Sequence, residues 1–123
     1  MKIAITSKGK TLDAEIDPRF GKAEYILIVD TDNLSVEVLD NSINANLSKG
    51  QGIQAAAMIN ENGASILLTG FCGPSPFEAL KNAGIKVANV AGTVREAIHA
   101  FEGGELSYAD EFTMALPRKR EKI

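Results

Sequence analysis

The chain has very few of the side chains that most often bind metals or act as nucleophiles. Among its 123 residues there is one cysteine, Cys72, and one histidine, His99. A single cysteine excludes an internal disulfide framework and a zinc site built from several cysteines. A catalytic Cys–His pair would require these two distant residues to meet in the fold, and nothing in the local sequence indicates that they do.

Long hydrophobic runs are also absent. No apolar stretch approaches the roughly 20 residues of a membrane-spanning helix, and the start, MKIAITSKG, lacks the apolar region of a signal peptide. The net charge of −3 argues against a general nucleic-acid-binding protein. We therefore expect a cytoplasmic protein that has no membrane or nucleic-acid partner and whose thiol stays reduced.

Two signatures of enzymes are missing as well. The chain contains no complete phosphate-binding P-loop. The first predicted strand, residues 2–6, has no acidic residue in its interior, whereas a nuclease of the ribonuclease H type needs clustered acids that bind two metal ions. These absences predict that the protein is not an enzyme.

Short apolar runs alternate with helical patterns along most of the chain. The run YILIV is continuously apolar, as a strand covered on both faces would be, and SVEVL alternates polar and apolar residues, so it should be half-exposed. With a turn between them, the two runs predict an antiparallel hairpin. The strand–helix–strand units after it favour parallel pairing. The pattern therefore predicts an α/β fold, a five-stranded mixed sheet with helices on its faces. The expected strands are residues 2–6, 25–29, 35–39, 65–69 and 85–88, and the expected helices are 53–62, 76–83 and 94–102.

Helix boundaries are marked by capping residues. Ser75 with Glu78 and Thr93 with Glu96 each match a capping box, and Gly63 is placed to end the first helix. The chain length suits one compact domain, residues 1–107, followed by a C-terminal arm and basic tail, residues 108–123. The tail PRKREKI has a net charge of +3. It is either a solvated end or a docking element for an acidic partner or RNA.

Three glycine-bearing loops should meet where the strands end, which is where open α/β sheets bind ligands. They follow the first strand, precede the first helix and precede the second helix. Helix N-termini favour anions, and glycines allow the backbone to approach a ligand closely. The pattern predicts a shallow site for a small anionic ligand, to which Lys8 could add charge. The candidate binding residues are Arg19, Phe20, Gly21, Asn44, Asn46, Lys49, Gly50, Gly52, Gly70, Cys72 and Gly73.

Several of these residues also have a purely structural interpretation. The glycines at 50 and 52 could only shape a loop, and Arg19 could pair with Asp17 or Glu24. Cys72 precedes a predicted helix, a position that lowers the pKa of a thiol and suits a metal ligand. A free cysteine also packs well as a small apolar residue.

Several phrases, in order, resemble one known family. They are MKIAITSKG, DPRFGKAEYILIVD, NANLSKGQGIQAAAMI, LLTGFCGPSPFEALKNAGIKV and GTVREAIHAFEGGEL. Together they cover about residues 1–107 and are similar to the dinitrogenase iron–molybdenum cofactor biosynthesis family, which includes NifX, NafY, NifB C-terminal domains and small stand-alone proteins. The resemblance implies a ribonuclease H-like sheet.

The resemblance also implies a function. Members bind an anionic metal–sulfur cluster without a covalent bond, either an iron–molybdenum type or, in the orange-protein branch, a molybdenum–copper sulfide. They carry, store or insert the cluster, which implies a donor or acceptor protein as a partner. The implied site contains residues 19–21, the 44–52 loop and residues 70–74, with Cys72 as the candidate metal ligand.

One position departs from the nitrogenase members, which often have a histidine before Phe-Gly. Here that residue is Arg19, and no cysteine follows near Ala23. A guanidinium pairs with an anion but does not ligate a metal. We therefore expect a stand-alone relative that handles another cluster. The alternative is a regulatory or interaction module that binds a phosphate-bearing molecule or a protein.

Overall fold

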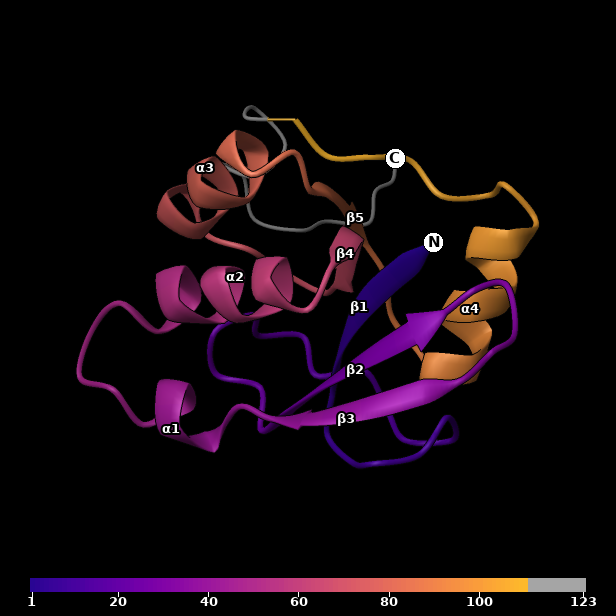
Figure 1. Cartoon of the computed structure of the whole chain (residues 1–123), viewed down its shortest axis with the longest axis horizontal. Coiled ribbons are helices and arrows are strands. Elements are labelled where there is room, and N and C mark those ends of the chain that lie inside the picture. The colour runs from indigo at the N-terminus through magenta and orange to yellow at the C-terminus, as the bar shows by residue number, and fades with distance from the viewer. Residues whose placement is uncertain (111–123) are drawn as a thin grey trace, which may run out of the picture.

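Five strands form one mixed sheet in the computed structural model, which describes residues 1–110 (Figure 1). The sheet order is β3-β2-β1-β4-β5. β2 runs antiparallel to β1 and β3, whereas β4 runs parallel to β1 and β5. The predicted α/β class, hairpin and mixed sheet are confirmed. The strands are β1 (Lys2–Ser7), β2 (Tyr25–Asp30), β3 (Val36–Asp40), β4 (Ala64–Thr69) and β5 (Lys86–Asn89).

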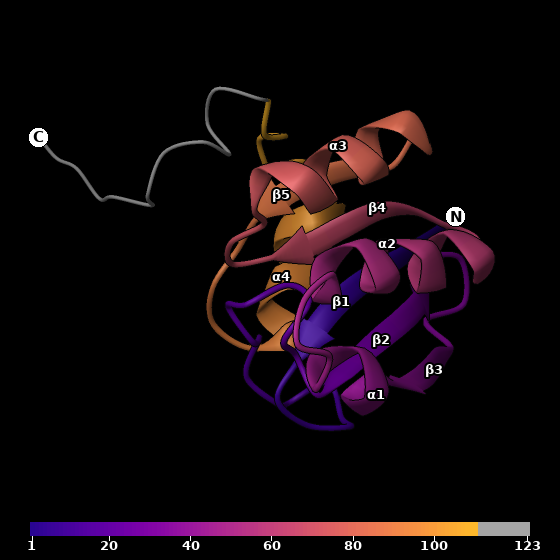
Figure 2. The same cartoon turned by 90° about the vertical axis from the view of Figure 1, so that its left-hand side faces the viewer.

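Four helices complete the described part of the fold. α2 (Gln51–Glu61) and α3 (Pro74–Asn82) cover one face of the sheet, and α4 (Val94–Glu102) covers the other (Figures 1 and 2). The short helix α1 (Ser42–Ala45) lies in the segment that was expected to be only a loop. The sheet is compatible with the ribonuclease H-like arrangement, and that name remains a prediction.

The central strands are buried on both faces, because helices cover both sides of the sheet. Ile3 and Ile5 of β1 pack with Val94 and Ile98 of α4, whereas Ala4, between them, belongs to the cluster under α2 and α3. This alternation follows from the two-residue period of a strand. The continuous apolar run of β2 had predicted burial of this kind, and its four inner residues are buried.

The edge strand β3 is more exposed than its alternating sequence suggested. Val36 is 38% exposed and Val38 is 40% exposed. Neither residue belongs to a core cluster, and only Leu39 packs against one. An edge strand has a neighbour on one side only, so the alternation did not produce a buried face here.

The start of α3 differs from the predicted start. The N-cap residue is Gly73, Pro74 occupies the first turn, and no side chain caps the helix. The predicted box of Ser75 with Glu78 is therefore wrong. Proline has a backbone angle already suited to the first helical position, so Pro74 begins the helix before Ser75 can act as its cap.

The predicted start of α4 and the predicted end of α2 are confirmed, whereas α2 begins two residues before the expected residue 53. At α4, Thr93 Oγ1 accepts from Glu96 N at 3.1 Å, and Thr93 N donates to Glu96 Oε1 at 2.9 Å. Gly63 directly follows Asn62, the C-cap residue of α2, and has a left-handed φ of 81°. A glycine at this position ends the helix in the left-handed conformation without the strain that a side chain would add.

The beginning of the C-terminal arm lies along the free edge of β5. Tyr108 forms a bridge with Ala88, and Ala109 N donates to Val87 O at 2.7 Å. The Lys86 amino group lies 5.3 Å from the centre of the Tyr108 ring. The basic tail, residues 117–123, lies outside the described residues. Within residues 1–110, none of the helices has the length and apolar character needed to cross a membrane.

Candidate functional site

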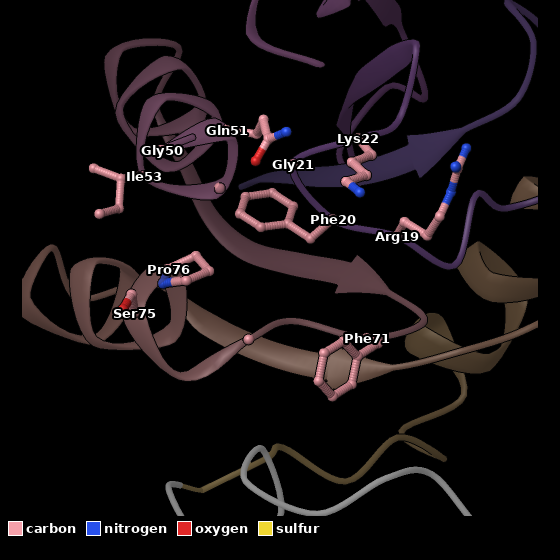
Figure 3. A pocket seen from close by; sticks show the side chains of 12 residues that line it. Arg19, Phe20, Gly21, Lys22, Gly50, Gln51, Ile53, Phe71, Ser75 and Pro76 are labelled. Atoms are coloured by element: carbon pink, nitrogen blue, oxygen red, sulfur yellow. The ribbon is translucent and has the colours of Figure 1, made fainter. Parts of the chain in front are cut away.

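The three predicted loops meet around one cavity of about 540 Å³ (Figure 3). The cavity lies between the segment that follows Pro18 and the starts of α2 and α3. Of the residues predicted for the site, Arg19, Phe20, Gly21, Gly50, Gly52 and Gly73 line it. Gln51 and Phe71, which also line it, lie within the implied segments 44–52 and 70–74, whereas Lys22, Ile53, Ser75 and Pro76 were not predicted.

The first and third loops are joined by backbone hydrogen bonds. Phe20 N donates to Phe71 O at 3.1 Å, and Phe71 N donates to Pro18 O at 2.7 Å. Gly70 allows this approach, because a Cβ there would lie 2.5 Å from Pro18 Cα. Gly70 therefore shapes the cavity wall by packing against another loop.

The start of α2 is packed between the other two segments. A Cβ on Gly21 would lie 2.6 Å from Gly52 N, and a Cβ on Gly52 would lie 2.7 Å from Pro76 Cγ. These two glycines allow protein segments to touch one another. By contrast, nothing lies within 4 Å of a Cβ built on Gly50. A Cβ built on Gly73 would have its nearest neighbour, Pro76 Cδ, 3.8 Å away. Of these glycines, Gly50 leaves open space at the backbone, and Gly73 has room for a Cβ in ordinary van der Waals contact with Pro76.

Neither helix that begins at the cavity has a side-chain cap or an acidic residue in its first turn. The backbone N–H groups of Gln51, Gly52 and Ile53 donate to no acceptor within residues 1–110. In α3, proline at 74 and 76 leaves Ser75 as the donor of the first turn, and its N–H has no acceptor in the same range. Such N–H groups, together with the positive end of the helix dipole, favour an anion.

The charged residues of the lining are two cations, Arg19 and Lys22. The Arg19 guanidinium donates from Nε to Asp17 Oδ1 at 3.2 Å and from Nη2 to Asp17 Oδ2 at 3.3 Å. The structure thus selects Asp17 over Glu24 as its partner. The hydrogen bond with Asp17, followed by their charge attraction, raises the pKa of Arg19 above its ordinary value.

Lys22 is a cation of the cavity lining that was not among the predicted site residues. Its side chain is exposed, and it lines the cavity together with Phe20 (Figure 3). It makes no hydrogen bond or ion pair with any described residue. The sequence feature that could have indicated Lys22 is its position directly after Phe20-Gly21, because that turn places the backbone of the next residue beside the cavity.

A second cavity, of about 400 Å³, shares Arg19 and Lys22 with the first. Asn46 and Lys8 line this second cavity, and Lys49 lines neither. The other lining residues are Asp17, Glu24, Ser42 and Ala45.

Asn44 has a structural contact instead of a place in either cavity. Its Nδ2 donates to Asn41 Oδ1 at 2.9 Å. The buried Asn41 in turn donates to Gly21 O at 3.2 Å and to Ala23 O at 2.8 Å. Asn41 therefore holds the Phe20-Gly21 turn in place, a role that the sequence did not suggest.

Cys72 is fully buried in the core cluster beneath α2 and α3 and does not line either cavity. Its Sγ lies 3.6 Å from Gly73 O. Burial raises the pKa of the thiol to about 12. The expected lowering of this pKa by the helix start is therefore wrong, because desolvation of the thiolate outweighs the helix dipole. The role of Cys72 as a metal ligand stays a prediction.

His99 lies on the opposite face of the sheet from Cys72, since α4 covers the face that α2 and α3 do not (Figure 1). A Cys–His pair is thus ruled out. Within residues 1–110, no group of three or more His, Cys, Asp or Glu side chains could hold a metal ion. The site fits an anion held by backbone and cations better than a bare metal ion held by side chains.

The family model described as dinitrogenase iron-molybdenum cofactor matches residues 1–104. The chain belongs to this family. The resemblance drawn from the motifs is therefore confirmed. No curated protein matches the chain.

Several solved structures are similar to this member of the dinitrogenase iron-molybdenum cofactor family. The apo form of the orange protein from Desulfovibrio gigas is 43% identical, with a TM-score of 0.85 over 88% of this chain and 92% of that one. A putative NifB protein from Thermotoga is 36% identical, with a TM-score of 0.78 over 97% and 98%. A putative dinitrogenase from Methanocaldococcus jannaschii, 22% identical with a TM-score of 0.66 over 89% and 94%, shares the fold.

Proposed function

We propose that this protein binds and carries an anionic metal–sulfur cluster, of the iron–molybdenum or the molybdenum–copper sulfide type, without catalysing a reaction. The observation that carries the proposal is the composition of the larger cavity. Two uncapped helix starts, four backbone N–H groups without an acceptor in the described chain and two cations line it, with no acidic residue in the lining. Membership of the cofactor family supports the same cargo.

The lining also suits the surface of a sulfide cluster. Phe20, Phe71, Ile53 and Pro76 give apolar contact, whereas the N–H groups and cations give positive charge. A sulfide-ligated cluster spreads its negative charge over several large sulfur atoms, so a mixed apolar and cationic wall costs it less desolvation than it would cost a small anion of concentrated charge. Bound in this way, the cluster keeps its own sulfide ligands and needs none from the protein.

The proposed role includes a donor or acceptor protein, because an open cavity can receive and release cargo without unfolding. Phe71 is 42% exposed and Ile53 is 46% exposed at the cavity rim, where a partner could contact them. We place this exchange in the cytoplasm, where clusters and the single thiol stay reduced.

Anaerobic reconstitution tests the proposal. The apo protein is incubated separately with iron and sulfide, with tetrathiomolybdate, and with tetrathiomolybdate plus copper, and is then desalted. We expect at least one mixture to leave metal, sulfide and visible absorption on the protein in a fixed ratio. A matched sample denatured in urea should retain none.

The reconstitution experiment can also contradict the proposal. If no mixture leaves metal on the folded protein, the carrier function is wrong. A thermal-shift screen of phosphate-bearing molecules in the absence of metal then tests the alternative, a regulatory module. Stabilisation by a nucleotide alone would favour that alternative over the cluster.

A further inference from the structure

The two cations of the larger cavity differ in what the protein has already bound to them. We propose that Lys22 is the specificity-determining residue of this site, the cation that contacts the anionic cargo, whereas Arg19 is held by the protein itself. This assignment rests on the proposed cluster-binding function and concerns the same cavity.

Arg19 is fixed by a carboxylate that cannot turn to solvent. The side chain of Asp17 is only 4% exposed, and it accepts from the backbone N of Arg19 at 3.0 Å as well as from the guanidinium at 3.2 and 3.3 Å. In Figure 3 the guanidinium extends away from the rings of Phe20 and Phe71. Cargo that drew the Arg19 guanidinium into the cavity would leave a buried carboxylate without its cation, which is costly.

Lys22 has no such partner. Within residues 1–110 its amino group makes no hydrogen bond, ion pair or ring contact, and the nearby acid Glu24 lines only the smaller cavity. Its backbone is nevertheless well placed, because Gly21 before it packs against Gly52 and accepts from Asn41 at 3.2 Å. The backbone of Lys22 is therefore held in place, while its amino group has no partner among the described residues.

The chemistry of an ammonium group suits a cluster of variable shape. A guanidinium prefers planar, two-point contacts, whereas an ammonium on four methylenes is a compact charge that can approach a sulfide from many directions. The apolar side chains that line the same cavity, such as Phe20, reduce competition from water. The site therefore selects cargo by negative charge more than by a fixed outline.

The test is titration of the full anaerobic chain with tetrathiomolybdate alone, followed by absorption and equilibrium dialysis. Lys22→Gln should raise Kd about tenfold or more, the loss expected for one charge-assisted contact, and should weaken its salt dependence. Lys22→Arg, which keeps the charge, should restore most of the affinity. Lys2→Gln changes the net charge equally at the far end of β1 and should leave Kd unchanged.

Substitutions at the ion pair complete the design. Arg19→Gln should lower Tm because it strands Asp17, and the double variant Asp17→Asn with Arg19→Gln should recover part of that loss. In both folded proteins Kd should rise less than in Lys22→Gln. A folded Arg19→Gln protein that loses more affinity than Lys22→Gln overturns the assignment.

The two proposals fail in distinguishable ways. If the wild-type protein binds tetrathiomolybdate and Lys22→Gln binds it equally well, only the role of Lys22 is wrong. If the wild type retains neither tetrathiomolybdate nor any reconstituted cluster, the proposed function fails, and the role of Lys22 fails with it.

Discussion

The start of α4 differs from the starts of α2 and α3 in whether side chains accept hydrogen bonds from the free N–H groups of the first turn. Every helix begins with N–H groups that have no partner inside the helix. At α4, Thr93 and Glu96 satisfy two donors with a complete capping box. At α2 and α3, the N-cap residues are Gly50 and Gly73, which have no side chain to accept a hydrogen bond.

The difference follows the position of each helix. α4 begins away from the cavity, and its donors are used to stabilise the fold. α2 and α3 begin at the cavity, and their donors are left available to a ligand. A glycine at the N-cap costs only a few tenths of a kcal/mol relative to a capping side chain, so the two starts at the cavity leave their donors unsatisfied at little loss of stability.

The largest expected effect comes from destroying the packing that brings the uncapped starts together. Gly21→Ala would place a Cβ 2.6 Å from Gly52 N, at a residue whose φ is 23°. We expect the free energy of unfolding, measured with urea, to fall by more than about 2 kcal/mol and cluster retention to be lost.

Gly84→Ala is the matched control, since Gly84 also has a left-handed φ, 79°, but has nothing within 4 Å of an added Cβ. It should cost only about 1 kcal/mol of backbone strain and leave retention intact. Equal losses in the two variants would show that strain, not the contact with α2, makes Gly21 necessary.

The next prediction gives α3 the kind of cap that α4 has. Gly73 has extended backbone angles, φ −67° and ψ 170°, and the nearest neighbour of an added Cβ is 3.8 Å away. An aspartate at this position can accept from Ser75 N. Gly73→Asp should not lower Tm, and it should weaken tetrathiomolybdate binding about tenfold or more because it adds a negative charge at the cavity.

Thr93→Ala, at the start of α4, is the opposite case. It should lower the free energy of unfolding by about 1 kcal/mol and leave the Kd for tetrathiomolybdate unchanged. The contrast between the two helix starts would be disproved if Gly73→Asp bound as tightly as the wild type, or if Thr93→Ala bound as poorly as Gly73→Asp.

The smallest expected effect on binding comes from Cys72→Ala. If backbone and cations hold the cargo, retention should match the wild type, and loss of the buried sulfur should cost about 1 kcal/mol of stability at neutral pH. Full loss of bound metal in a folded Cys72→Ala protein would instead establish the thiol as a ligand.

The same variant has a defined pH dependence. The pKa of the folded thiol is raised from 9.0 to about 12, so its protonated form stabilises the fold fully below pH 9 and loses that effect as pH rises towards 12. The stability advantage of the wild type over Cys72→Ala should therefore shrink between neutral pH and about pH 10 in urea titrations. A constant difference would contradict the assigned burial.

Much of the fold could be predicted because it rests on local patterns. The apolar run of β2 predicted a doubly covered strand, and Thr93 with Glu96 predicted the start of α4. The prediction failed at Ser75, where Pro74 offered an equally local but stronger helix start. It also missed α1, whose four residues give too short a pattern to recognise.

The candidate site was only partly predictable. Glycines near predicted helix starts indicated the three loops that meet. The sequence did not indicate that Gly52 packs on Pro76, that Asn41 holds Gly21, or that Lys22 lines the cavity. Each of these facts depends on contacts between segments that are distant along the chain, and one sequence carries no record of them.

By itself, then, the sequence determined the α/β class, the order of the strands and of the three longer helices, and the family, and it predicted the three loops that line the cavity. The fold class and element order follow from periodicity and capping residues, which act over a few neighbouring residues, whereas the family follows from the order of motifs along nearly the whole chain. Only the tertiary structure decided which side chains line the cavity, which are buried away from it and which are already paired within the protein. Burial removed Cys72 from the cavity, a buried partner bound Arg19, and Lys22 was left with the free charge. Burial and pairing depend on which segments pack together, and the fold sets both.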